Sequence, residues 1–281
     1  MRGVGVLVPV FGDAPYLAEA LDSALGQEPP PTEVVVVDNA SARPLRLEDR
    51  HATRCTLVRR EVNGGPAGAR ATGLEHSGAP LIALLDCDDL WEPGKLAAQL
   101  AALKREPQAG LCFGAATVIG PDGTPTGERL AEVAPGLHDP ATLAPSLFHR
   151  NPIPTSSTLI RREAIERAGG LDHAATDDLG LWLRLARADV GFLFEPAARV
   201  RYRRHPGGVT ADLRAGARMA LAALDAHGDL LNPSARARAR RDWLALLARG
   251  EFKARRYAAG RAARAPRAPE SPPWLAAAPS P

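Results

Sequence analysis

Short runs of apolar, mostly β-branched residues recur in the N-terminal part of the chain, at Val4–Val10, Val34–Val37 and Leu81–Leu85. Runs this short, with no polar alternation, are typical of strands that are buried on both faces of a parallel sheet. Segments with apolar residues at helical spacing lie between them, over about Pro15–Gly26 and Ala67–His76. Because short strands alternate with helices, the sequence predicts an α/β fold with a mainly parallel central sheet flanked by helices.

The same alternation continues to about residue 212. Further strands are predicted at Cys55–Arg59, Leu111–Ile119, Ser157–Ile160, Phe192–Phe194 and Val200–Arg203, and further helices at Pro93–Glu106, Arg162–Ala168 and Asp177–Ala188. Residues 120–155 are rich in Pro and Gly and give no clear pattern. We therefore predict one large layered domain over residues 1–212.

Charge is distributed unevenly along the 281 residues, whose net charge is +3. Residues 213–281 hold 13 of the 35 Lys and Arg residues but only 5 of the 32 acids. We expect residues 213–265 to form a basic helical extension and the Pro- and Ala-rich residues 266–281 to be disordered. The Arg-rich helix predicted over Ser234–Arg264 either packs on the body with its charges in water, which we favour, or lies on an anionic membrane surface. Nucleic-acid binding is not expected, because the body is acidic and no recognition motif is present.

Several classes of protein are excluded by what the sequence lacks. No apolar run reaches the roughly 18 residues that a membrane span needs. The N-terminal run is broken by Pro9 and has no small-residue cleavage site, so no signal peptide is predicted. Three cysteines, Cys55, Cys87 and Cys112, are too few and too scattered for a disulfide framework or a zinc site. We expect a cytoplasmic protein, with peripheral contact at the inner face of a membrane as the alternative.

Acidic residues follow two of the predicted strands directly. Asp38 ends the second strand, and Asp86, Asp88 and Asp89 come straight after Leu81–Leu85. In open α/β sheets, ligands bind beyond the carboxyl ends of the strands. Carboxylates this close together repel one another unless a cation neutralises them, and oxygen ligands suit Mg²⁺ or Mn²⁺. A solvated acidic turn is the alternative for the cluster, and a cap of a turn or helix is the alternative for Asp38.

Five segments stand in order along the chain: Val6–Gly12, Leu17–Gln27, Val34–Ser41, Asn63–Arg70 and Leu85–Lys95. In this order and spacing they resemble glycosyltransferase family 2, whose members are nucleotide-sugar transferases of the Rossmann-like GT-A fold. The resemblance covers about residues 4–210. Each segment alone is a weak signal, whereas the five together are specific.

The resemblance implies a role for each matching position. Backbone and ring contacts of Pro9, Val10 and Phe11 would line the nucleotide pocket, Asp38 would bind the base, and Arg70 would lie near the nucleotide. Asp86-Cys87-Asp88 matches the DXD signature, whose acids would hold the ribose and a Mn²⁺ or Mg²⁺ ion. Asp88 is the first choice of metal ligand, Asp86 is a second metal ligand that would lie nearer the ribose, and Asp89 is a candidate to assist. Cys87 falls inside this nucleotide-sugar-binding segment without a chemical role of its own. His205, in a closing Tyr-Arg-x-His segment, would reach the metal or the diphosphate.

The catalytic base is expected in the segment that runs from Asp177 into the following helix. Asp178 matches the acid that acts as general base in inverting members of the family, and Asp177 is the second candidate. Gly180 replaces a residue that is usually acidic, which leaves the choice between the two open. Both acids would also stabilise the N-terminus of the helix, and this capping role is compatible with catalysis.

The function that follows is metal-dependent transfer of a sugar from a nucleoside-diphosphate sugar, with a UDP-sugar favoured, to an acceptor hydroxyl with inversion. Residues 120–156 and the C-terminal region are expected to recognise the acceptor, and Thr155–Ser157 either bond to its hydroxyls or simply lead into a strand. A non-catalytic sugar-nucleotide-binding or scaffold protein of the same fold is the alternative, and Gly180 keeps it open. A nucleotidyltransferase is disfavoured, because Pro9–Asp13 is not a Gly-rich basic loop.

Overall fold

The computed structural model of the protein describes residues 3–130, 133–171, 178–208 and 213–264, with side chains in the last helix described as far as Phe252. Eight strands of this part of the chain form the main sheet, in the order β3-β2-β1-β4-β10-β6-β11-β9. Their bounds are β1 Val4–Val10, β2 Glu33–Asp38, β3 Thr56–Arg59, β4 Leu81–Leu84, β6 Ala109–Phe113, β9 Gly136–His138, β10 Leu159–Arg161 and β11 Gly191–Phe194. Strands β3, β2, β1 and β4 are mutually parallel, whereas β10 is antiparallel to both of its neighbours and β9 is antiparallel to β11.

A second, smaller sheet has the order β5-β12-β7-β8. It consists of β5 Leu90–Trp91, β7 Ala116–Ile119, β8 Pro125–Leu130 and β12 Val200–Arg203. The single strand predicted over residues 111–119 is therefore wrong, because the chain leaves the main sheet after β6 and enters the small sheet at β7. The break falls at Gly114, where a Cβ atom would lie 1.6 Å from the carbonyl oxygen of Ala198. Only glycine allows the two backbones to approach this closely.

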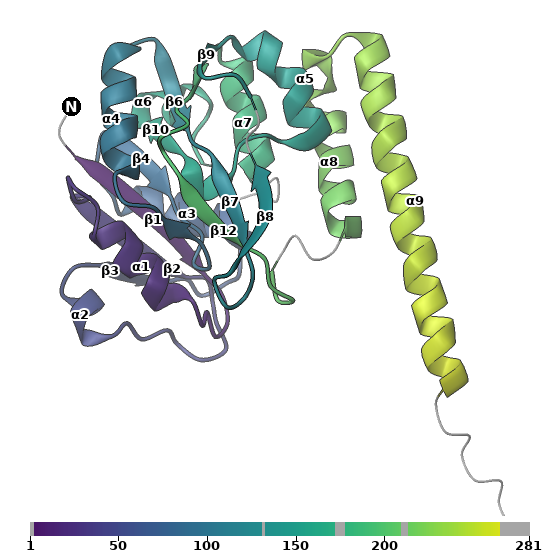
Figure 1. The fold of residues 1–281 in the computed structure, drawn as a ribbon, viewed down its shortest axis with the longest axis horizontal. Helices are drawn as coiled ribbons and strands as arrows, with labels where there is room; N and C mark the ends of the chain where they lie inside the picture. The colour runs from purple at the N-terminus through teal and green to yellow at the C-terminus, as the bar shows by residue number, and fades with distance from the viewer. Residues whose placement is uncertain (1–2, 131–132, 172–177, 209–212, 265–281) are drawn as a thin grey trace, which may run out of the picture.

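Helices cover both faces of the main sheet, as Figure 1 shows. The helices are α1 Leu17–Leu25, α2 Asp49–Ala52, α3 Gly65–Glu75, α4 Lys95–Arg105, α5 Pro140–Arg150, α6 Arg162–Arg167, α7 Asp178–Arg187, α8 Leu213–His227 and α9 Pro233–Arg264, with short 3₁₀ turns at Thr155–Ser157 and Gly228–Leu230. Side chains alternate along β1, so that Val6 and Val8 join the core under α1 and α4 while Leu7 joins the core under α3. The expected α/β layers are confirmed.

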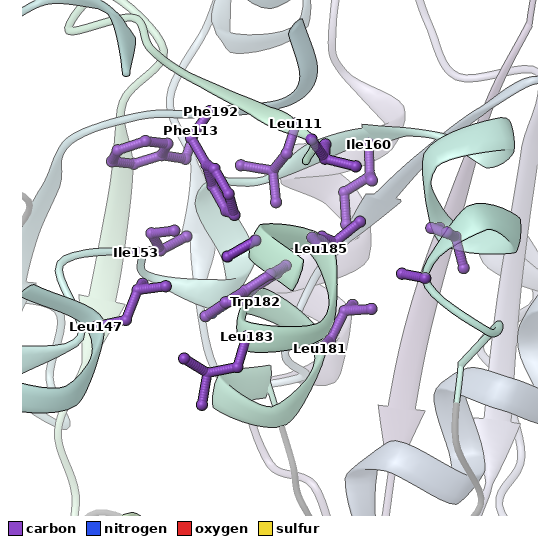
Figure 2. Close-up of a cluster of buried hydrophobic side chains, with 14 of the residues drawn as sticks. Leu111, Phe113, Leu147, Ile153, Ile160, Leu181, Trp182, Leu183, Leu185 and Phe192 are labelled. Atoms are coloured by element: carbon purple, nitrogen blue, oxygen red, sulfur yellow. The ribbon is translucent and has the colours of Figure 1, made fainter. Parts of the chain in front are cut away.

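The larger of the two cores holds the helix that begins at Asp178. Trp182 of α7 is fully buried in it, and Figure 2 shows the ring among side chains from the sheet and from the segment before β10. The neighbours labelled there include Leu111, Phe113, Ile153 and Ile160. Because α7 is fixed along its apolar face, the position of its first residue is fixed as well.

The two C-terminal helices pack on the body and on each other (Figure 1). Leu224 of α8, Ala239 of α9 and Leu231 between the two helices belong to the same core as α7. Trp243 Nε1 of α9 donates a hydrogen bond to the carbonyl oxygen of Phe148 at 2.7 Å. This is the packed arrangement that we favoured for the basic helix. No helix in the described ranges is long and apolar enough to cross a bilayer. The division into residues 1–212, 213–265 and 266–281 stays a prediction, and residues 265–281 lie outside the described part.

Lys95, at the start of α4, is fully buried. Its Nζ lies 3.7 Å from the centroid of the Trp91 ring and donates a hydrogen bond to the carbonyl oxygen of Thr158 at 3.4 Å. Burial penalises the charged amine and lowers the pKa of Lys95 well below its usual value.

This burial predicts a pH dependence of stability. An unfolded lysine stays protonated to about pH 10.4, so between the lowered pKa and that pH the unfolded state binds more protons than the folded state, and stability rises with pH. Lys95→Met keeps the length of the side chain and removes the amine. We expect the gain in free energy of unfolding between pH 7 and pH 9, measured by urea titration, to be smaller in the variant than in the wild type. An identical gain in both proteins would contradict the assignment.

Candidate active site

The strand-end residues singled out in the sequence gather at one edge of the main sheet. Strands β2, β1 and β4 are adjacent and parallel, so their carboxyl ends open on the same side. The Phe11 ring, just beyond β1, is 61% exposed at this edge, Pro9 is half-buried, and the Val10 side chain is buried in the core. Phe11 can therefore offer its ring to a base, whereas Val10 can offer only its backbone. Their roles toward a nucleotide stay predictions.

Asp38 is only 1% exposed and is held by the loop that follows it and by Arg59 of β3. The backbone N–H groups of Ser41 and Leu45 each donate to its carboxylate at 3.0 Å, and Arg59 Nη1 donates to it as well. Burial acts to raise the pKa of Asp38, but these hydrogen bonds outweigh it, and the net pKa lies below the usual value. Asp38 is thus an ionised carboxylate that shapes the loop after β2, and its contact with a base stays a prediction.

Asn39, which lies in the Val34–Ser41 segment but has no predicted role, connects this loop to the start of α3. Its Nδ2 donates to Asn63 Oδ1 at 2.8 Å and to the Gly65 carbonyl at 3.0 Å, and its Oδ1 accepts from the Gly64 N–H at 3.1 Å. Helix α3 carries Arg70, which is 5% exposed and donates to Asp86 Oδ1 at 2.5 Å. Arg70 therefore lies beside the acidic cluster, and its position near a nucleotide stays a prediction.

Asp89 is the buried member of the acidic cluster. The Ser156 hydroxyl donates to its Oδ2 at 2.6 Å and the Arg203 backbone N–H donates to its Oδ1 at 2.8 Å. Burial, together with the charges of Asp86 and Asp88, holds the pKa of Asp89 well above its usual value. Because both oxygens are enclosed, Asp89 acts as a structural joint between the loop after β4, the turn before β10 and the end of β12.

Arg203 completes this joint from the small sheet. Its guanidinium donates to the Asp88 carbonyl and the Pro121 carbonyl, each at 2.9 Å, and forms an ion pair with Glu19 at 2.9 Å. The same group stacks over the Tyr16 ring, with 4.2 Å between Arg203 Cζ and the ring centroid. Its donors face protein groups and the side chain is buried, so Arg203 positions the acidic loop and is not placed to bind a phosphate.

Asp88 and His205 form the partly exposed pair of the site. His205 Nε2 lies 3.0 Å from Asp88 Oδ2, and the imidazole packs edge-on against the Tyr16 ring at 5.2 Å. A carboxylate oxygen suits both Mn²⁺ and Mg²⁺, whereas an imidazole nitrogen is an uncommon ligand of Mg²⁺, so this donor set fits Mn²⁺ better than Mg²⁺. Within the described residues no group of three His, Cys, Asp or Glu side chains stands in metal-binding geometry. Burial raises the pKa of the adjacent Cys87, which keeps it a neutral thiol.

The predicted base is hydrogen-bonded to Thr155, the residue that precedes Ser156 of this joint. Asp178 is the first residue of α7, and its Oδ2 accepts a hydrogen bond from the Thr155 hydroxyl at 2.5 Å. Ser156, which follows Thr155, uses a single hydroxyl for two bonds: it accepts from the Asp86 N–H at 3.0 Å and donates to Asp89. Ser156 and Ser157 are fully buried, so neither can bond to an acceptor hydroxyl. Asp177, the second candidate, lies outside the described residues.

Ser156→Ala tests whether the joint holds the acidic loop. The change removes the hydrogen bond that the Asp86 N–H donates and one of the two that the buried Asp89 carboxyl accepts, and losing a buried hydrogen bond in this way typically costs about 1–3 kcal/mol. The matched control is Ser157→Ala, an equally buried serine whose hydroxyl bonds, among the described residues, to the nearby Pro154 carbonyl alone. We expect a larger fall in the free energy of unfolding for Ser156→Ala in urea titrations. Equal losses in the two variants would contradict the joint.

Known proteins resemble this chain in sequence and in fold. The family model described as glycosyl transferase family 2 matches residues 5–168. TuaG of Bacillus subtilis (strain 168), ascribed to teichuronic acid biosynthesis, is 28% identical over 189 residues, which are 66% of this chain and 72% of TuaG. The succinoglycan biosynthesis protein ExoU of Rhizobium meliloti (strain 1021) is 40% identical over 97 residues, 33% of this chain and 28% of ExoU. The crystal structure of S. aureus TarS 1–349 superposes with a TM-score of 0.60 at 14% identity, covering 86% of this chain and 71% of that 1–349 chain, and this likeness shows the fold alone.

The matched range holds most of the site. Asp38, Arg70, Asp86 and Asp88 all lie inside residues 5–168, whereas Asp178 and His205 lie beyond them. The model match covers more than half of the chain, and the fold agrees with it. The chain belongs to glycosyl transferase family 2 and is a glycosyltransferase with the GT-A fold.

Proposed function

We propose that this chain transfers a sugar from a nucleoside-diphosphate sugar to an acceptor hydroxyl, with inversion and with the help of a divalent cation. One observation carries the proposal: consecutive residues bond to the predicted base and to the acidic loop. Thr155 bonds to Asp178, and Ser156 bonds to Asp86 and Asp89. The base and the donor-binding loop are thus held side by side by a single buried turn, as a direct displacement at one carbon atom requires.

The edge formed by β2, β1 and β4 is the proposed donor site. The exposed Phe11 ring offers a surface for a base, and the loop held by Asp38 and Asn39 forms the adjoining wall. Arg70 supplies a buried positive charge next to Asp86, at the place where a diphosphate would need one. A UDP-sugar is the favoured donor, and the crystal structure of S. aureus TarS 1–349 in complex with UDP, a protein with the same fold, supports that choice.

Asp88 and His205 would hold the cation. When bound, Mn²⁺ or Mg²⁺ would stabilise the negative charge that develops on the departing diphosphate. The Arg203 side chain fixes the Asp88 backbone, and Tyr16 supports the His205 ring, so both ligands have a fixed direction. Asp86 accepts a hydrogen bond from Arg70 at its Oδ1. Its proposed role is to contact the ribose.

Asp178 would act as the general base. The acceptor oxygen attacks the anomeric carbon from the side opposite the phosphate, its proton passes to the Asp178 carboxylate, and the carbon–oxygen bond to the diphosphate breaks. The N-terminus of α7 stabilises the carboxylate form, and the Thr155 hydroxyl orients Oδ2. A single displacement of this kind inverts the configuration at the anomeric carbon.

The rival function is nucleotide binding without transfer. It rests on Gly180, which is buried in α7 and offers no acid at a position where the family usually has one. It predicts that UDP binds and that no acceptor is glycosylated. The Asp178 contact with Thr155 favours the enzyme instead, because a scaffold has no need for an oriented carboxylate beside the donor site.

Asp178→Asn tests the base. The amide keeps the size of the side chain but cannot take the acceptor proton, so we expect transfer to fall about 10²–10⁴-fold with UDP affinity unchanged. UDP release from UDP-sugars with a mixed acceptor panel, and calorimetric titration of UDP, measure the two properties. The matched control is Glu163→Gln, which removes an exposed acid from the first turn of α6 and should leave both properties intact. Normal transfer by Asp178→Asn would exclude Asp178 as the base.

Asp88→Ala tests the cation site. We expect the variant to bind UDP equally with Mn²⁺ and with EDTA, whereas the wild type binds it more tightly with Mn²⁺, because the variant lacks one of the two protein ligands. The control is Glu128→Gln, which removes an exposed acid paired with Arg204, the neighbour of His205. A Mn²⁺ effect of the same size in Asp88→Ala and in the wild type would contradict the assignment.

A further inference from the structure

A groove of about 650 Å³ lies where the C-terminal helix meets the body. Its walls come from the end of β8, from α5 with the two residues after it, and from α9. The bond from Trp243 of α9 to the Phe148 carbonyl of α5 holds the two long walls together. A volume of this size is within the range of small-ligand pockets, about 300–1,000 Å³.

The groove is basic on its rim and apolar on its floor. Arg129, Arg150 and Arg238 line it from three different elements, and all three are exposed. Among the described residues none of the three forms an ion pair, whereas Arg187, Arg218 and Arg240 of the same region each pair with an acid. The lining holds a single acid, Asp242. The apolar floor includes Leu130, Val133, Pro152, Leu231 and Ala239.

The groove is connected to the proposed site through two segments. Asn151 and Pro152 line it, and three residues after Pro152 the Thr155 hydroxyl bonds to Asp178. Three residues span at most about 11 Å, so the groove wall begins within one or two sugar rings of the proposed base. On the other side, Arg129 follows Glu128, which pairs with Arg204 beside His205.

We propose that this groove is an acceptor subsite for a negatively charged saccharide, whose phosphate or uronate carboxylate is bound by Arg129, Arg150 and Arg238. The inference rests on the proposed function, because it gives the substrate class of the same transfer reaction. Guanidinium groups pair bidentately with both kinds of anion, and the apolar floor suits the C–H face of a pyranose ring. The net positive lining disfavours a neutral or cationic acceptor relative to an anionic one.

The test uses the whole chain, two tetrasaccharides of matched size and one phosphorylated monosaccharide. A hyaluronan tetrasaccharide carries carboxylates, chitotetraose is its neutral counterpart, and glucose 1-phosphate presents the phosphate. Affinities are measured by calorimetry on the wild type and on Arg150→Gln/Arg238→Gln. The control is Lys104→Gln/Arg105→Gln, which makes the same change in net charge on α4, over the other core. Titration of UDP with Mn²⁺ on each protein reports on the donor site and on folding.

We expect the wild type and the control to bind one of the two charged saccharides. We expect both proteins to bind chitotetraose weakly or not at all. The groove variant should bind the charged saccharide about tenfold or more weakly with unchanged UDP affinity. Which of the two charged probes binds then distinguishes carboxylate from phosphate. UDP binding without binding of any charged probe, or equal affinity in the groove and control variants, would overturn the subsite alone. No binding by the wild type of UDP, or of another nucleoside diphosphate titrated in its place, would instead overturn the proposed function.

Discussion

The buried carboxyl of Asp89 is the point at which three distant segments of the chain meet. It accepts from Ser156, 67 residues away, and from the Arg203 backbone, 114 residues away. The loop after β4 carries Asp86 and Asp88, the turn before β10 carries Thr155, and the end of β12 leads to His205. A buried acid with two internal donors is costly to leave unsatisfied, so these segments are held in a single arrangement. The proposed donor site, cation ligands and base all depend on it.

The small sheet is what brings the last of these segments to the site. Strand β12 pairs with β5, which follows the acidic loop directly, and with β7, which leaves the main sheet at Gly114. The close approach of Gly114 to Ala198 lets the chain change sheets without a gap in the core. The small sheet thereby places Arg203 and His205 at the acidic loop. The Arg203 guanidinium fixes the Asp88 backbone, and His205 lies beside the Asp88 carboxylate.

Local patterns in the sequence predict the parts of the fold that local physics decides. The apolar runs at β1, β2 and β4 and the acids after them follow from burial on both faces and from the common edge of parallel strands. The split of residues 111–119 could not be predicted, because it depends on contact with Ala198. Helix α5 was missed within residues 120–155, although Asp139 followed by Pro140 is a helix-start signal, and Asp139 does cap it. The Asp89 joint and the role of Ser156 depend on pairings between distant segments, which one sequence does not reveal.

Diffraction from crystals grown with UDP and MnCl₂, recorded at the manganese absorption edge, tests the central claim most directly. If the Asp89 joint holds a donor site, the anomalous peak should lie within coordination distance of Asp88 Oδ2 and His205 Nε2 and next to the diphosphate. Asp178 should face the side of the diphosphate where the sugar would be attached. A bound UDP with no manganese peak at Asp88 and His205, or with a peak elsewhere in the chain, would contradict the account.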